Sequence, residues 1–183
     1  MATTGGVSAA AVLAAATKQA HWLINATLEG VTQELANRPA PGMANPIGTA
    51  YAHVVCAEDG VVNGLLQGQQ PIAASVYAGK TGVDRPMPMP GMVEGDMEDW
   101  LHNSHVDLDA LRAYSAAVFA ATEAFIAGVD ESTLGRKIDM SFAGLGEMPF
   151  SDVYTLLVVQ HCDNFSGEIS AMKGVFGMKG YPF

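Results

Sequence analysis

Two histidines lie within apolar or small-residue helical surfaces and are the main candidates for chemistry in this sequence. His161 lies between Leu157, Val158 and Phe165, where an unpaired polar side chain costs free energy. The residues on the same helical side as His53 are all small: Thr49, Ala50, Ala57, Gly60 and Gly64. An isolated histidine is more often a core residue with one hydrogen bond, but two of them on separate helices favour a shared site. Helical bundles build metal and ligand sites from such inward side chains, and imidazole is a common ligand.

Two imidazoles alone make an incomplete metal site, because protein metal sites need at least a third donor. The candidates for that donor carry a thiol or a carboxylate and lie near one of the two histidines: Cys56, Glu58, Cys162 and Asp163. Cys56 shares a helical face with His53, although cysteine is more often a small buried residue. Cys162 points away from His161, and Asp163 is expected to face water. The residues by themselves therefore leave the third ligand open.

The remaining histidines and a group of methionines rank below this pair. His21 borders the apolar stripe of the first helix. His102 and His105 have the i, i+3 spacing that can bind metal, but such pairs are commoner at exposed helix starts. Three methionines in a proline-rich loop are interpreted as flexible packing material instead of a copper site: Met87, Met89 and Met92.

Four segments with helical periodicity must position these side chains. The first is predicted to run from a Ser8 cap to just before Arg38, and the second from Asn45-Pro46 to about Gly68. The third is predicted to run from Asp107 or Asp109 to about Gly128, and the fourth from after Ser151 to about Gly174. The second and third are joined by a long crossover, from Gln69 to about Met97, whose prolines and glycines exclude a long helix. A short helical turn is expected near Met97 to His102. No segment alternates with strand periodicity, so the sequence predicts an all-α four-helix bundle forming a single domain over residues 1–183.

The overall charge argues against two classes of partner. Nine Lys and Arg against nineteen Asp and Glu give a net charge of −10, and the basic residues are scattered. Contact with nucleic acid or with an anionic membrane is therefore not expected. No uninterrupted apolar stretch reaches the roughly 20 residues of a membrane span. Cys56 and Cys162 are predicted to be free thiols, and the cytoplasm is the expected compartment.

Several short motifs occur in a characteristic order along the whole chain. They are Pro39-Ala40-Pro41-Gly42, Asn45-Pro46-Ile47-Gly48, His53 followed by Glu58, Gly167-Glu168-Ile169, and the tail Gly177-Met178-Lys179-Gly180-Tyr181-Pro182-Phe183. Together they resemble the DinB/YfiT-like family. The resemblance implies a four-helix bundle, commonly a homodimer, with a divalent metal such as zinc or nickel held by three histidines.

The resemblance also implies which residues take those three positions. His53 on the second helix and His161 on the fourth match two of them, whereas the third, four residues after His161, is Phe165. Replacing one member of an i, i+4 pair removes a ligand and adds bulk near the metal position. Metal affinity is expected to fall sharply.

Three functional hypotheses follow. Family members with complete sites are linked to thiol-dependent transfer, so the first is a residual metal-dependent transferase or hydrolase that uses a low-molecular-weight thiol or a water. In it, His53 and His161 hold the ion and Glu58 acts as a base or orients a ligand. The second is a non-catalytic module that binds a small molecule in an apolar pocket lined by Phe165 and the small residues beside His53. The third is a dimeric scaffold without a pocket.

Overall fold

The computed structural model describes residues 6–89 and 95–183, and most of them are helical. The α-helices are α1 (Ala9–Thr27), α2 (Gln33–Ala36), α3 (Ile47–Asp59), α4 (Met97–Asn103), α5 (Leu108–Ala127), α6 (Glu131–Leu134), α7 (Phe150–Tyr154) and α8 (His161–Val175). Two π-helical segments, η1 (Gly60–Leu66) and η4 (Thr155–Gln160), continue α3 and join α7 to α8. Two short 3-10 turns are η2 (Ile72–Ala74) and η3 (Ser141–Ala143).

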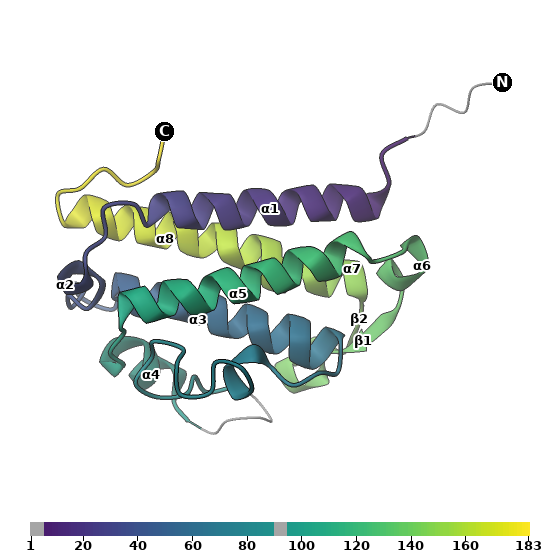
Figure 1. The fold of residues 1–183 in the computed structure, drawn as a ribbon, viewed down its shortest axis with the longest axis horizontal. Coiled ribbons are helices and arrows are strands. Elements are labelled where there is room, and N and C mark those ends of the chain that lie inside the picture. Colours follow the sequence, from purple (N-terminus) through teal and green to yellow (C-terminus); the bar gives the residue numbers. More distant parts are fainter. Residues whose placement is uncertain (1–5, 90–94) are drawn as a thin grey trace.

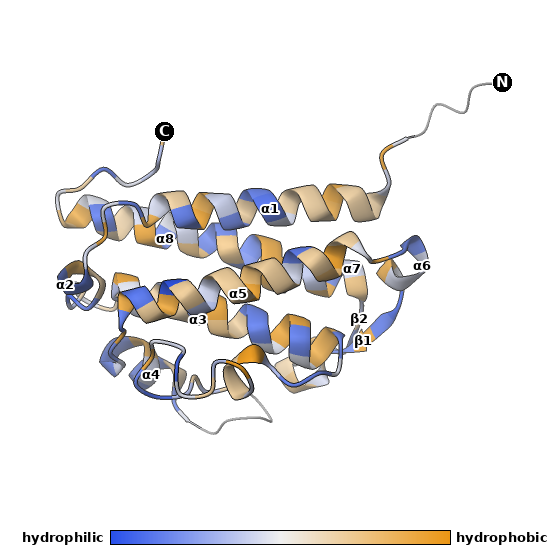
Figure 2. Cartoon of the chain, viewed as in Figure 1, coloured by the Kyte–Doolittle hydropathy of each residue, from blue (hydrophilic) through white to orange (hydrophobic). Residues whose placement is uncertain are grey.

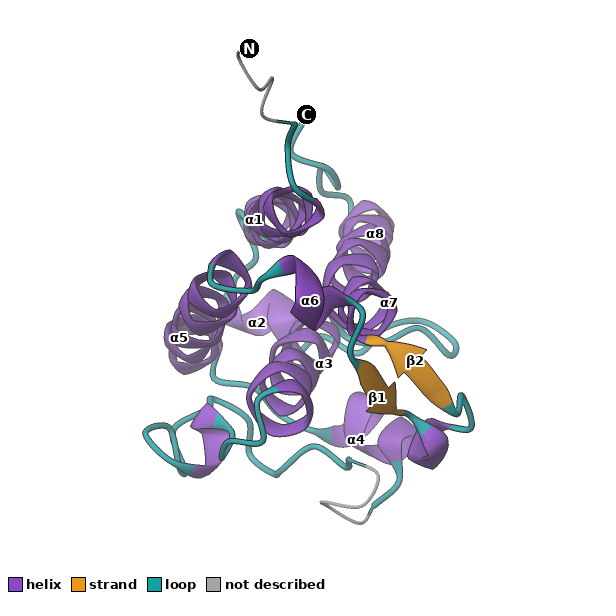
Figure 3. Ribbon diagram, turned by 90° about the vertical axis from the view of Figure 1, so that its right-hand side faces the viewer, coloured by secondary structure: helices purple, strands orange, loops and turns teal. Residues whose placement is uncertain are grey.

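Four long helical segments pack side by side as a bundle: α1, α3 with η1, α5, and α7 with η4 and α8 (Figure 1). Each packs against two of the others, α1 and α3 both contacting α5 and α8. The end-on view in Figure 3 shows these four segments around a common centre. Large side chains fill that centre, including Tyr51, Leu111 and Ile169, which are fully buried. The predicted all-α bundle with a long crossover is confirmed.

The caps that the sequence indicates are formed at several helix ends. Ser8 accepts the N–H of Ala11 at the start of α1, and Asp107 accepts the N–H of Ala110 at the start of α5. α5 ends at Ala127 with Gly128 as its C-cap, close to the predicted end. A side-chain oxygen at the cap satisfies one of the backbone donors that a helix start leaves free. These short-range hydrogen bonds explain why the two starts could be predicted.

The end of the first helix was predicted wrongly. α1 ends at Thr27 instead of continuing towards Arg38, and Gly30 has a φ of 77°, a conformation that favours glycine. The buried Lys173 ammonium donates to the carbonyl oxygens of Thr27 and Glu29, at 2.6 and 2.9 Å. A cation from α8 therefore satisfies the free carbonyls at this helix end, a long-range contact that periodicity cannot reveal.

A small hairpin was also missed by the sequence analysis. β1 (Lys137–Asp139) pairs antiparallel with β2 (Glu147–Pro149), with Ile138 opposite Met148. Each strand has three residues, too few to display an alternating pattern. The hairpin leads directly into α7, whose first residue is Phe150.

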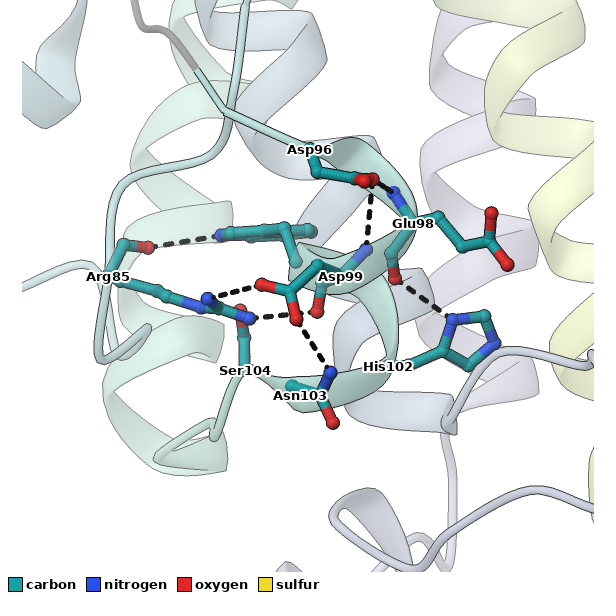
Figure 4. A network of polar contacts seen from close by, with 8 residues as sticks. Arg85, Asp96, Glu98, Asp99, His102, Asn103 and Ser104 are labelled. Atoms are coloured by element: carbon teal, nitrogen blue, oxygen red, sulfur yellow. Dashed lines mark hydrogen bonds and ion pairs between the residues drawn. The ribbon is translucent and has the colours of Figure 1, made fainter.

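The crossover is attached to α4 through Arg85. Arg85 binds the Asp99 carboxylate at 2.7 Å and the Ser104 hydroxyl at 2.9 Å, which holds the loop against α4 (Figure 4). The indole of Trp100 donates to the Arg85 carbonyl. The predicted short helix is α4. Met92 lies outside the described residues.

Among the residues that the structure describes, one helix, α5, is long and apolar enough to cross a membrane by length and composition alone. In the fold its apolar residues pack in the bundle: Leu111, Tyr114 and Val118 are all fully buried against α1 and α3. Figure 2 shows hydrophilic residues interspersed along the same helix. Packing in a protein core accounts for its apolar composition.

Candidate functional site

Three aromatic rings form a triangular cluster between α3 and α8. The ring centroids of His53, His161 and Phe165 are 4.9 Å apart in each of the three pairs. Phe165 follows His161 by four residues, so the two project from the same face of α8. The structure thus brings the two predicted histidines together and places a phenyl ring at the third corner.

A cavity of about 700 Å³ opens beside this cluster. His53 and His161 line it together with apolar side chains that include Leu157, Met87 and Met89. Among the described residues that form its wall, none is Asp, Glu, Lys or Arg. The two imidazoles and the Gln69 amide are therefore the main side-chain hydrogen-bonding groups that this wall presents.

Both helices that carry the histidines widen into π-helical turns beside the cavity. The N–H of Gln67 donates to the carbonyl of Val62, a bond that spans five residues instead of four. Gly60, Val61 and Leu65 of η1 line the cavity, and His161 immediately follows η4. π-helical turns are rare and frequently occur at functional sites, because the extra residue per turn redirects side chains.

Both histidines are held in the neutral form. Burial, and to a smaller extent the positive charge that His161 would carry, lower the pKa of His53 to about 4. Burial also lowers the pKa of His161 to about 4. His53 Nδ1 is buried, and it has no hydrogen-bond partner in the part of the chain that the structure describes. Near pH 7, two uncharged imidazoles offer one donor and one acceptor each.

The candidates for a third ligand all have other environments. Burial raises the pKa of the Cys56 thiol to about 12, and Cys56 lines a different cavity. The Cys162 thiol is buried and directed at the Ala20 carbonyl, whereas Asp163 is exposed. Over residues 6–89 and 95–183, no group of three or more His, Cys, Asp or Glu side chains is arranged to hold a metal ion. These side chains therefore do not fit the three-donor ion that the resemblance implies.

Glu58 takes part in a buried charged network that the sequence analysis did not identify. Its carboxylate is fully buried and lies 3.0 Å from His21 Nε2. His21 Nδ1 lies 3.0 Å from Glu123, and the Phe119 ring stacks on the imidazole with centroids 3.9 Å apart. The cavity wall does not include Glu58. The only sequence signal was His21 at the edge of the α1 stripe, because its two partners lie on α3 and α5.

Comparisons with known proteins agree with this helical architecture. The model of the DinB superfamily matches residues 16–164, so the chain belongs to that superfamily. A crystal structure of a conserved protein from Enterococcus faecalis superposes with a TM-score of 0.71. It is 17% identical, and the match covers 92% of this chain and 99% of that one, which shows a common fold. No curated protein matches the chain.

Proposed function

We propose that this DinB-superfamily protein binds a small organic molecule in the cavity beside His53 and His161, without a tightly held metal ion. The observation that carries the proposal is the position of Phe165. Its ring completes the aromatic triangle at the same 4.9 Å spacing as the histidine pair. Phe165 is not one of the residues that line the cavity, but its phenyl ring packs against both imidazoles and supplies no lone pair to a metal ion, which leaves the two histidines to face a cavity with a mostly apolar wall.

The cavity wall specifies an uncharged and mostly apolar ligand. A charged group transferred from water into such a pocket needs a partner of opposite charge. The wall offers none among its described residues, and burial keeps both imidazoles neutral near pH 7. A hydroxyl, carbonyl or amine on the ligand can pair with an imidazole nitrogen of His53 or His161, because both residues line the cavity.

A residual metal-dependent enzyme is the second candidate. The two neutral imidazoles support it, since imidazole ligates metals in its neutral form. A thiol substrate carrying carboxylates would find no cation among the described residues of the wall. The predicted role of Glu58 as a base would require its carboxylate to leave His21. The geometry therefore favours the binding module.

A pair of fluorescent probes tests the proposal. N-phenyl-1-naphthylamine is uncharged, whereas 1-anilinonaphthalene-8-sulfonate has a similar aromatic frame with an added negative charge. We expect saturable binding of the neutral probe and at least tenfold weaker binding of the sulfonate in fluorescence titrations, because the buried charge has no partner.

Two variants test whether the neutral probe binds in this cavity. Ala57 lines the cavity, and Ala120 is an exposed residue of α5. Ala57→Phe is expected to abolish binding of the neutral probe, whereas Ala120→Phe retains it, with the fold of each checked by circular dichroism. Equal binding by the two variants, or tighter binding of the sulfonate, would overturn the proposal.

A further inference from the structure

A second cavity lies under the crossover, next to the first. It measures about 360 Å³ and is lined by residues of α3, η2 and the crossover, together with Tyr114 of α5. Gly60, Met87 and Met89 belong to the walls of both cavities. The two spaces are thus separated by the same few side chains.

The partition between the two cavities consists of flexible atoms. A side chain at position 60 would overlap the terminal methyl group of Met89, so Met89 lies directly over Gly60. Methionine has three rotatable side-chain bonds and readily adopts other rotamers. A rotation of Met89 can therefore connect the two spaces without a change in the backbone.

The second cavity has a preorganised wall. Asp59 is fully buried and accepts four hydrogen bonds, from Asn63, from the N–H groups of Ile72 and Ala73, and from Tyr114. These bonds lie between 2.7 and 2.9 Å and attach the crossover to α3 and α5.

The charged groups of this wall are largely occupied or peripheral. Asp59 is saturated by its four donors, and Arg85 is paired with Asp99 (Figure 4). Asp84 is exposed. The interior of the second cavity therefore presents mainly alanine, proline, valine and methionine side chains.

We infer that the two cavities form one elongated binding site, divided by Met87 and Met89. The inference rests on the proposed function and specifies its ligand. The ligand is an extended uncharged molecule, with a hydrogen-bonding group at the imidazoles and an alkyl or similar apolar chain that passes the methionines into the second cavity. Thr81 and Asp84 also line the second cavity and suit a second polar group on such a chain.

Alcohols of two lengths test this arrangement by displacing N-phenyl-1-naphthylamine. 1-Hexanol and 1-dodecanol share a head group and differ in chain length. Ala73 lines only the second cavity, and its backbone N–H remains available to Asp59 when the side chain changes. Ala73→Phe is expected to weaken the binding of 1-dodecanol at least tenfold and to change the affinity for 1-hexanol less than twofold. The reason is that each buried methylene contributes about fourfold in affinity.

Ala73→Leu is a milder version if the phenylalanine variant does not fold, and it should show a smaller effect in the same direction. Met89→Ala is expected to tighten the binding of 1-dodecanol relative to that of 1-hexanol, because the substitution removes the side chain that separates the two cavities. Equal changes for both alcohols, or no change for either, would overturn the single elongated site while leaving neutral-probe binding intact. Absence of neutral-probe binding in the wild type would instead contradict the proposed function.

Discussion

Phe165 and His161 show how much a single side chain decides at the residue scale. Both project from one face of α8 towards His53, and each ring pair has the same centroid separation. The backbone that would present a third imidazole is therefore already in place. What differs is the chemistry of the Phe165 ring, which unlike an imidazole has no lone pair to donate to a metal ion.

This geometry predicts that Phe165→His restores a metal site. The third imidazole would complete a set of three neutral donors, which suffices for a zinc ion with water as the fourth ligand. We expect near-stoichiometric zinc in the variant after incubation with zinc and desalting, measured by elemental analysis, and much less in the wild type.

Phe165→Leu provides the matched control, because it alters packing at the same position without adding a donor. It should retain as little zinc as the wild type. Near-stoichiometric zinc in the wild type, lost in His53→Ala, would mean that another group completes the site. That result would favour the residual enzyme over the binding module.

At the element scale, the site depends on how closely α3 approaches its neighbours. Gly48 lies in the first turn of α3, where a side chain would overlap Val106 and lie 2.7 Å from the Ala36 carbonyl oxygen. The position thus allows the start of α3 to contact both α2 and the segment that precedes α5.

Gly48→Ala is predicted to destabilise the protein by about 1–3 kcal/mol, the usual cost of overpacking. Gly174 is also helical, but its added methyl group would meet nothing within 4 Å. Gly174→Ala should therefore stabilise by roughly 0.5–1 kcal/mol, following helix propensity. Urea denaturation of both variants checks that their changes in the free energy of unfolding have opposite signs. Stabilisation by Gly48→Ala would refute the close contact.

At the scale of the whole molecule, one buried charged network connects three of the four long helices. His21 of α1 lies between Glu58 of α3 and Glu123 of α5. Burial by itself lowers the pKa of His21, but hydrogen bonds to the two carboxylates and their negative charges outweigh it. The pKa of His21 is therefore raised above its usual 6.5. The folded protein binds the proton of His21 more tightly than the unfolded chain does.

Stability is accordingly predicted to depend on pH through His21. A raised pKa contributes stability that is fully present below the unfolded value of about 6.5 and is lost as the pH rises through the folded value. His21→Gln should destabilise by about 3 kcal/mol at pH 6, because it leaves Glu58 buried without its cation. The difference between wild type and variant should shrink as the pH rises, in urea titrations from pH 6 to pH 9.

The exposed His105 serves as the control for this experiment. His105→Gln should leave the pH profile of the wild type unchanged. A difference between wild type and His21→Gln that stays constant over the whole pH range would show that His21 acts only by packing.

Two expectations about the whole molecule stay predictions. The first is a homodimer in the cytoplasm, which rests on resemblance and can be checked by analytical ultracentrifugation and by localisation of a tagged protein. The second is the absence of nucleic-acid and membrane contacts, which rests on the net charge of −10.

The sequence by itself determined the helical class, most helix starts, the crossover and the pairing of His53 with His161. Caps and periodic apolar positions are local signals, so they can be read from residues close together in the chain. Gly30 is a local signal for the end of α1, but only the tertiary structure shows that the ammonium which satisfies the Thr27 carbonyl comes from Lys173 on α8. The same holds for the partners of Glu58 and for the second cavity, which are defined by contacts between distant segments that no local pattern encodes.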